Sequence, residues 1–208
     1  MDKKERMVEW QLKGRDITDE RIIHAMQMIN RETFLPDNMK ELAYEDTPLP
    51  IGKGQTISQP YIVAYMAQVL DLHKSEKVLE IGTGCGYNAA VISQLASHVY
   101  SLEIIEWLAD LARENLKAEE IDNVSVRMGD GNKGWPEYAP FDKILLTAAT
   151  PEIPGPLKKQ LKVGGKILAP VSNAFQKLML IEKTGENEYA EHDMIHVRFV
   201  PMTGDSGS

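Results

Sequence analysis

The chain from residue 77 onward alternates short apolar runs with longer segments of helical spacing. Five apolar runs have the length of buried strands and lie at residues 78–81, 99–102, 124–126, 144–146 and 166–169. Between them, residues 88–96 and 106–118 place their apolar side chains at the spacing of an amphipathic helix. Alternating buried strands and helices predict a mainly parallel sheet with helices on its faces. We therefore expect a doubly wound, Rossmann-like α/β fold.

The two ends of the chain depart from this alternation. Near the N-terminus, Thr18-Asp19-Glu20 predicts a helix start, and the apolar positions after it keep helical spacing. Pro36, Pro48 and Pro50 mark an irregular connection that leads into a predicted loop at residues 51–60, and Pro60 suits the first position of another helix. Near the C-terminus, the apolar runs 178–181 and 197–200 flank a polar turn and predict an antiparallel hairpin.

These signals divide the chain into three parts. We expect residues 1–60 to form an N-terminal helical extension with a substrate loop, and residues 61–204 to form the α/β domain with its C-terminal antiparallel strand hairpin. Residues 205–208 should form a disordered tail. A chain of 208 residues is long enough for one compact domain with such an extension.

Composition and charge narrow the class of protein. The chain is 43% hydrophobic, and no apolar run approaches the roughly 20 residues of a membrane span, so we expect a soluble protein without a membrane partner. The mixed charges of residues 1–6 differ from a secretory signal and favour the cytoplasm. A net charge of −8 without a basic block disfavours nucleic acid as a partner. The single cysteine, Cys85, and the scattered histidines indicate neither a disulfide nor a metal site. As a separate expectation, we predict a monomer.

A glycine-rich turn follows the first strand of the α/β region. Gly82, Gly84 and Gly86 come directly after the run 78–81 and before the helical segment 88–96. Glycines allow a tight turn and let a ligand lie against the backbone, at the carboxyl end of a strand where open α/β sheets bind ligands. The spacing G-x-G-x-G differs from the dinucleotide pattern G-x-G-x-x-G and favours a ligand without a pyrophosphate.

Acidic residues end the next two predicted strands. Glu103 ends the second, where a carboxylate can accept hydrogen bonds from both hydroxyls of a ribose, and Asp130-Gly131 ends the third. Each feature alone is also typical of a structural turn or a solvated strand end, but together they predict a nucleoside site. Glu80, before the glycines, has two interpretations: contact with a cationic part of the ligand or, as we favour, orientation of the loop backbone.

Longer motifs resemble one methyltransferase family. The segment 80–87, Glu-Ile-Gly-Thr-Gly-Cys-Gly-Tyr, is similar to motif I of class I S-adenosylmethionine methyltransferases. Four further segments resemble the isoaspartyl methyltransferases in particular: the upstream segments 44–52 and 54–60, Gly129-Asp130-Gly131, and Thr147-Ala148-Ala149. The likeness extends from about residue 7 to residue 204, nearly the whole chain.

The resemblance implies a function and a set of site residues. It implies transfer of a methyl group from S-adenosylmethionine, leaving S-adenosylhomocysteine, to the α-carboxylate of L-isoaspartyl residues in damaged proteins and peptides, which begins their repair. Ser58 matches the catalytic serine, and the loop that closes over the methyl donor contains Gln55, Thr56 and Ile57. The implied cofactor positions are Glu80, Gly82, Thr83, Gly84, Glu103, Asp130, Gly131 and, last, Gln176. Lys53 departs from the histidine or uncharged residue that is frequent in the family.

The chemistry of this reaction agrees with the residues present. A carboxylate nucleophile is already ionised at neutral pH, so neither a general base nor a catalytic histidine is required. The hydroxyl of Ser58 could hold one carboxylate oxygen while the other attacks; its alternative role is the N-cap of the helix that begins near Pro60. Two other functions stay open: methylation of a different carboxylate or small molecule, and a non-catalytic module that binds an adenosyl nucleoside.

Overall fold

The computed structural model describes residues 1–172 and 175–204, and its centre is a seven-stranded sheet. The strand order is β5-β4-β3-β6-β7-β8-β9. The first five strands in this order are parallel to one another, whereas β8 is antiparallel to both of its neighbours, β7 and β9. The strands are β3 (Lys77–Ile81), β4 (His98–Glu103), β5 (Val124–Met128), β6 (Phe141–Leu146), β7 (Leu161–Ser172), β8 (Gln176–Lys183) and β9 (Tyr189–His196). The predicted mainly parallel, doubly wound sheet is confirmed.

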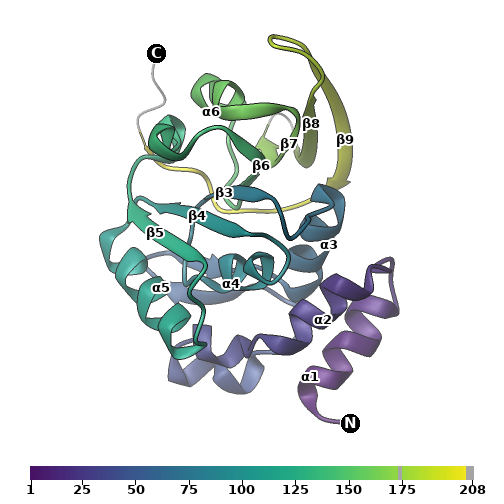
Figure 1. Ribbon diagram of the computed structural model, residues 1–208. Coiled ribbons are helices and arrows are strands. Elements are labelled where there is room, and N and C mark those ends of the chain that lie inside the picture. Colours follow the sequence, from purple (N-terminus) through teal and green to yellow (C-terminus); the bar gives the residue numbers. More distant parts are fainter. Residues whose placement is uncertain (173–174, 205–208) are drawn as a thin grey trace.

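Helices cover both faces of the sheet (Figure 1). One hydrophobic core lies between the sheet and α3 (Pro60–Leu70), α4 (Tyr87–Ser93) and α5 (Glu106–Ala118). A second core, on the other face, includes Leu157 of α6 (Gly155–Gln160) and Trp135. The connection from β5 to β6 contains the short 3₁₀ turns η4 (Gly131–Lys133) and η5 (Pro136–Tyr138).

The first 60 residues are mainly helical, as predicted, and pack against α3 and α4. They contain α1 (Lys3–Arg6), the π-helical segment η1 (Met7–Lys13), α2 (Glu20–Met28) and the 3₁₀ segments η2 (Arg31–Phe34) and η3 (Asp37–Leu42). Asp19 caps α2, because its carboxylate accepts a hydrogen bond from the Arg21 amide at 2.9 Å. Met7, Ile22 and Phe34 share one core with α3 and α4. The domain boundary at residue 60 therefore stays a prediction.

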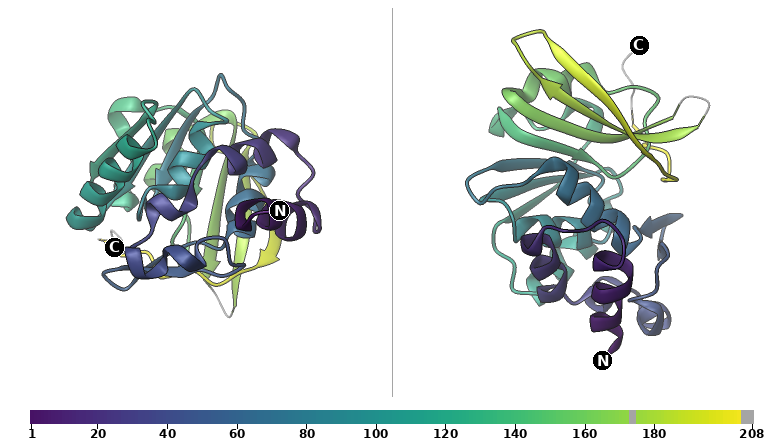
Figure 2. Two further views of the ribbon diagram at one scale, coloured as in Figure 1. Left: turned by 90° about the horizontal axis from the view of Figure 1, so that it is seen from below. Right: turned by 90° about the vertical axis from the view of Figure 1, so that its right-hand side faces the viewer.

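The C-terminal hairpin uses a different second strand from the one predicted. β8 pairs with β9, whereas residues 197–200 have left the sheet. β9 has only half-buried and exposed positions, so it lacks the apolar run that marks a buried strand. Val197 and Phe199 are apolar for another reason, because they pack, partly buried, against the first core. The chain then passes the end of β6, where the Ala149 amide donates to the Val200 carbonyl at 2.8 Å. The β8–β9 hairpin lies at the opposite end of the molecule from the N-terminal helices (Figure 2).

A short hairpin occupies much of the predicted loop at 51–60 and begins two residues before it. β1 (Leu49–Gly52) pairs antiparallel with β2 (Gln55–Ile57), and Gly52, Lys53 and Gly54 turn the chain with positive φ. α3 then begins at Pro60, as predicted. No helix in the described parts of the chain is long and apolar enough to cross a membrane. The predicted tail, residues 205–208, lies outside the described residues.

Candidate active site

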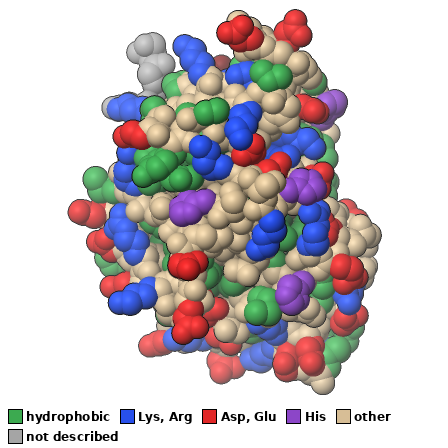
Figure 3. All heavy atoms as spheres, in the orientation of Figure 1, with side chains coloured by type: hydrophobic (Ala, Val, Ile, Leu, Met, Phe, Trp, Pro, Cys, Tyr) green, Lys and Arg blue, Asp and Glu red, His purple; other side chains and the backbone are tan. Residues whose placement is uncertain are grey.

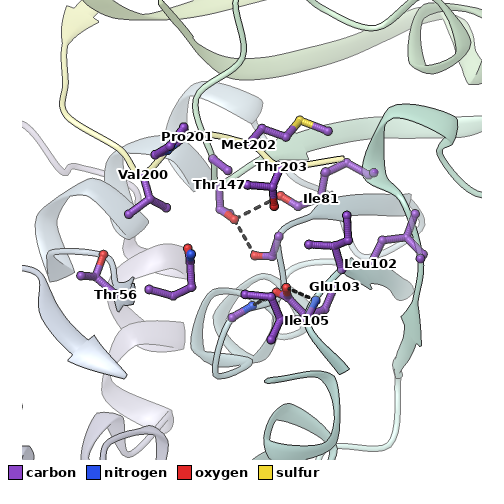
Figure 4. Close-up of a pocket in the computed structure, with 17 residues that line it drawn as sticks. Thr56, Ile81, Leu102, Glu103, Ile105, Thr147, Val200, Pro201, Met202 and Thr203 are labelled. Carbon is purple, nitrogen blue, oxygen red and sulfur yellow. Dashed lines mark hydrogen bonds between the residues drawn. The ribbon is translucent and has the colours of Figure 1, made fainter. Parts of the chain in front are cut away.

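A cavity opens at the carboxyl ends of β3, β4 and β6 (Figure 4). The strand order reverses at β3, and ligands of doubly wound sheets bind at this point. The cavity is small and open to solvent: it holds about 60 Å³, or about 580 Å³ with its open mouth included. The β1–β2 hairpin and residues 200–203 complete its walls. In Figure 4, Thr56 of the hairpin lies at one side, and Glu103 lies across the cavity from Thr203.

The loop after β3 lines the cavity through Gly82 and Gly84. Gly82 has a φ of 96°, a conformation that favours glycine, and its amide donates to the Leu102 carbonyl at 2.8 Å. A Cβ at Gly82 would lie only 2.5 Å from the hydroxyl oxygen of Thr147. That hydroxyl lies 3.1 Å and 2.5 Å from the carbonyl oxygens of Ile81 and Gly82. Glycine is therefore required at position 82 both by its positive φ and by the close approach of the Thr147 side chain.

Glu103 lines the cavity and holds two loops together. Its Oε2 accepts a hydrogen bond from the Gly84 amide at 2.8 Å, and its Oε1 accepts one from the Ile105 amide at 3.0 Å. The residue is only 5% exposed, so the carboxylate is fixed in place. Each carboxylate oxygen has a second lone pair, which leaves room for two more donors.

Asp130 and Gly131 lie at the end of β5, but only Gly131 lines the cavity. The Asp130 carboxylate accepts hydrogen bonds from the amide and the side chain of Asn132, both at 3.0 Å. Gly131 is held between neighbours, because a Cβ there would lie 2.2 Å from Cγ2 of Ile81 and 2.9 Å from Cε of Met202. Asp130 therefore shapes the turn that brings the Gly131 backbone to the cavity.

Glu80 is fully buried beneath the glycine loop and does not line the cavity. Its carboxylate accepts hydrogen bonds from the Ser101 hydroxyl and, at 2.7 Å, from the side-chain nitrogen Nδ2 of Asn88. Ser101 in turn contacts the Thr83 hydroxyl at 2.6 Å. Burial raises the pKa of Glu80 to about 7, although the hydrogen bonds from Ser101 and Asn88 oppose this shift. These contacts agree with the interpretation that Glu80 orients the loop.

Ser58 lines a groove beside the cavity, although it does not line the cavity itself. Thr56 and Thr147 line both the groove and the cavity, so the two adjoin close to Ser58. It also lines a small hollow beside the glycine loop that includes Thr83 and Asn88. The helix-cap alternative is not supported, because Gln59 occupies the N-cap position of α3 and no side chain caps that helix.

The remaining predicted residues fall in three places. Gln55 lines the cavity, and Ile57 is buried against the small hollow. Lys53 lies away from the groove, with its Nζ 5.6 Å from the centre of the Trp107 ring. Gln176 lines neither cavity nor groove; its side chain accepts from the Phe199 amide at 2.6 Å and donates to the Phe199 carbonyl at 3.1 Å. Gln176 therefore holds the C-terminal segment that forms one wall.

The sequence predicts no site role for Thr147 and predicts a hairpin strand at residues 197–200, whereas Thr147 and residues 196–203 line the cavity and the groove. Thr147 directly follows β6, so the argument from strand ends that selected Glu103 would also have selected it. Residues 196–203 offer no such signal, because their place depends on how the chain folds back after β9.

Solved structures share this architecture. A protein-L-isoaspartate O-methyltransferase superimposes with a TM-score of 0.89 and 32% identity, over 97% of this chain and 66% of its own. A putative protein-L-isoaspartate O-methyltransferase from Plasmodium falciparum, crystallised with S-adenosyl-L-homocysteine, has the same fold, with a TM-score of 0.86 and 24% identity over 98% and 99% of the two chains. The fold and the glycine-lined cavity define a class I S-adenosylmethionine-dependent methyltransferase.

Sequence comparisons identify the family. The model of the protein-L-isoaspartate(D-aspartate) O-methyltransferase family matches residues 2–207. Protein-L-isoaspartate O-methyltransferase 2 of Pelobacter propionicus is 50% identical over 207 residues, covering 99% of this chain and 92% of the relative. The enzyme of Methanothermobacter thermautotrophicus is 46% identical over 212 residues, covering 100% and 98%. The chain belongs to the protein-L-isoaspartate(D-aspartate) O-methyltransferase family, and it is an enzyme that uses S-adenosylmethionine.

The raised pKa of Glu80 predicts a pH dependence of stability. A carboxyl group whose pKa rises on folding contributes stability at low pH, and this contribution is lost as the pH rises from about 4.5 to about 7. We expect the free energy of unfolding of Glu80→Gln, measured in urea, to lack this loss, which is about 3 kcal/mol for a shift of this size. Parallel pH profiles for the wild type and Glu80→Gln would contradict the prediction.

Proposed function

We propose that this chain transfers the methyl group of S-adenosylmethionine to the α-carboxylate of L-isoaspartyl residues in damaged proteins and peptides, which begins their repair. The observation that carries the proposal is the place of Ser58, in an open groove that shares Thr56 and Thr147 with the glycine-lined cavity. The cavity suits the methyl donor and the groove suits an extended peptide. The relatives named above act on protein L-isoaspartate by name, which supports the same substrate class here.

The residues around the cavity fit S-adenosylmethionine. The two free lone pairs of the Glu103 carboxylate suit the ribose hydroxyls. Gly82, Gly84 and Gly131 line the cavity and can offer backbone atoms to the ligand. Asp130 would act from the adenine side by shaping its turn, and Glu80 and Thr83 by supporting the loop. Bound S-adenosylmethionine supplies a methyl group on a positively charged sulfur.

The chain's own contribution to methyl transfer is alignment and the removal of water. An isoaspartyl carboxylate is ionised at neutral pH, so no residue has to remove a proton. The Ser58 hydroxyl donates a hydrogen bond to one carboxylate oxygen and leaves the other free to attack the methyl carbon. Gln55, Thr56 and Ile57 enclose the reacting groups from the hairpin side, which raises the rate by holding them in one geometry.

We also infer a cytoplasmic location, a monomer, and the absence of nucleic-acid and membrane partners, as expected from the sequence. The acidic pI of about 5.2 supports the expectation about nucleic acid, because a polyanion is repelled by a protein of this charge. Sedimentation equilibrium would test the monomer directly.

The substrate class predicts discrimination between two isomeric peptides. An L-isoaspartyl peptide should accept the methyl group from S-adenosylmethionine, whereas its normal aspartyl twin should be methylated at least about a thousandfold more slowly, because its side-chain carboxylate lies one carbon further from the backbone path. Mass spectrometry of the two peptides after incubation measures this. Equal methylation of both twins, or of neither, would disprove the proposed substrate.

The ribose role of Glu103 predicts a loss of cofactor affinity. Glu103→Ala should weaken binding of S-adenosylhomocysteine by about 1–3 kcal/mol, because it removes the acceptors for the ribose and releases the Gly84 amide. Glu106→Ala is the matched control, since it removes the same charge from an exposed position on α5. Isothermal calorimetry of both variants measures the difference, and an unchanged affinity in folded Glu103→Ala would refute the role.

The alignment role of Ser58 predicts a loss of turnover without a loss of cofactor binding. Ser58→Ala should lower kcat by about tenfold or more, which corresponds to about 1.4 kcal/mol of barrier. Ser58→Asp should lose nearly all activity, because two carboxylates would repel each other at the reacting position. Neither variant should change the melting temperature much, since Ser58 does not cap α3. A fully active Ser58→Asp enzyme would rule out this role.

A further inference from the structure

Among the described residues that line the groove beside Ser58 there is one cation, Arg198, and no acidic side chain. Among the described residues that line it, the ionisable ones are His196, at the end of β9, and Arg198, two residues further. Both are exposed to solvent. Figure 3 shows histidine and basic side chains over the region where β9 ends above α3. This local charge is opposite to the net charge of −8 of the whole chain.

The acidic side chains close to this groove are already engaged. Asp193, on β9, pairs with Lys177 at 2.7 Å. Asp46, which precedes the β1–β2 hairpin, pairs with Arg15 and accepts a hydrogen bond from Gln59 at 2.8 Å. Within the described part of the chain, Arg198 forms no ion pair and no side-chain hydrogen bond that would hold it away from a ligand. Its guanidinium is therefore available to an anion.

The backbone on both sides of Arg198 is fixed. The Val197 amide donates to the Gln176 carbonyl at 3.1 Å, and the side chain of Gln176 holds both the amide and the carbonyl of Phe199. Arg198 is thus held at the rim of the groove by its two neighbours, while its side chain stays exposed. A cation in a fixed place can discriminate between peptides that differ in charge.

We propose that Arg198, assisted by His196, is an anion subsite that favours isoaspartyl peptides with a second carboxylate near the isoaspartyl residue. The inference rests on the proposed function, because the reacting carboxylate must lie at Ser58. A glutamate one to three residues away lies about 3–10 Å along an extended peptide, a span that fits a peptide lying in one groove. A lysine at the same position is repelled by the same charge.

The test compares isoaspartyl peptides that differ at one position. Each peptide carries Glu, Gln or Lys at one of the three positions on either side of the isoaspartyl residue, and kcat/KM is measured with S-adenosylmethionine at low and high salt. The wild type should favour the best Glu peptide over its Gln counterpart by about two- to fivefold, the size of effect that exposed charge pairs produce. High salt should reduce this ratio, because it screens exposed charges.

Variants assign the preference to the subsite. Arg198→Gln should bring the ratio of kcat/KM between the Glu and Gln peptides close to one. Arg198→Glu should reverse the charge preference, so that the Lys peptide has the highest kcat/KM. Lys159→Gln is the matched control, because it removes one positive charge from an exposed position on α6 and should keep the wild-type ratio.

Two results would overturn the inference while leaving the enzyme's function intact. One is equal kcat/KM for the Glu, Gln and Lys peptides at every position, and the other is an unchanged Glu-to-Gln ratio in Arg198→Gln. If no isoaspartyl peptide is methylated, including the neutral Gln series, the proposed function itself fails and the subsite with it. Methylation of the Gln peptides without charge preference therefore separates the two failures.

Discussion

The hydrogen bond from the Gly84 amide to the Glu103 carboxylate, 2.8 Å long, joins the loop after β3 to the end of β4. The other oxygen of the same carboxylate holds the Ile105 amide, which begins the approach to α5. On the opposite side, Thr147 at the end of β6 contacts the carbonyl oxygens of the same loop. Hydrogen bonds to an ionised carboxylate are about twice as strong as neutral ones, so Glu103 is the firmer of the two attachments. The loop stays open toward the cavity because side chains hold it from both sides.

The two buried carboxylates near this loop have different chemistry because their surroundings differ. Glu103 reaches the cavity and keeps lone pairs for a ligand. Glu80 is fully enclosed and directs its oxygens to Ser101 and Asn88, and its pKa rises to about 7. Loss of solvation penalises the charged form of Glu80 more than its hydrogen bonds stabilise it. Glu80 therefore supports the loop from below, while Glu103 both supports it and faces the ligand.

Two segments from opposite ends of the chain form the walls of the reaction site. The β1–β2 hairpin contributes residues 55–58, and the segment after β9 contributes residues 196–203. Each is attached to the core independently, the hairpin through buried Ile57 and the C-terminal segment through Gln176 and Ala149. The groove between them receives its positive charge from the C-terminal segment. The cavity and the groove can therefore differ in charge although they share Thr56 and Thr147.

The sequence by itself determined the sheet, the glycine turn, the start of α3 at Pro60 and the acidic residue at the end of β4, because strand and helix periodicity and turn chemistry are local properties. The motifs around Ser58 and residues 80–87 also identified the family. Only the tertiary structure decided that β9 spans residues 189–196, that Gln176 braces a wall, and that Arg198 faces the groove. β9 is an edge strand that packs against a single neighbouring strand, so it needs no apolar run to mark it. The places of Gln176 and Arg198 follow from contacts between segments about 20 residues apart, which no local pattern encodes.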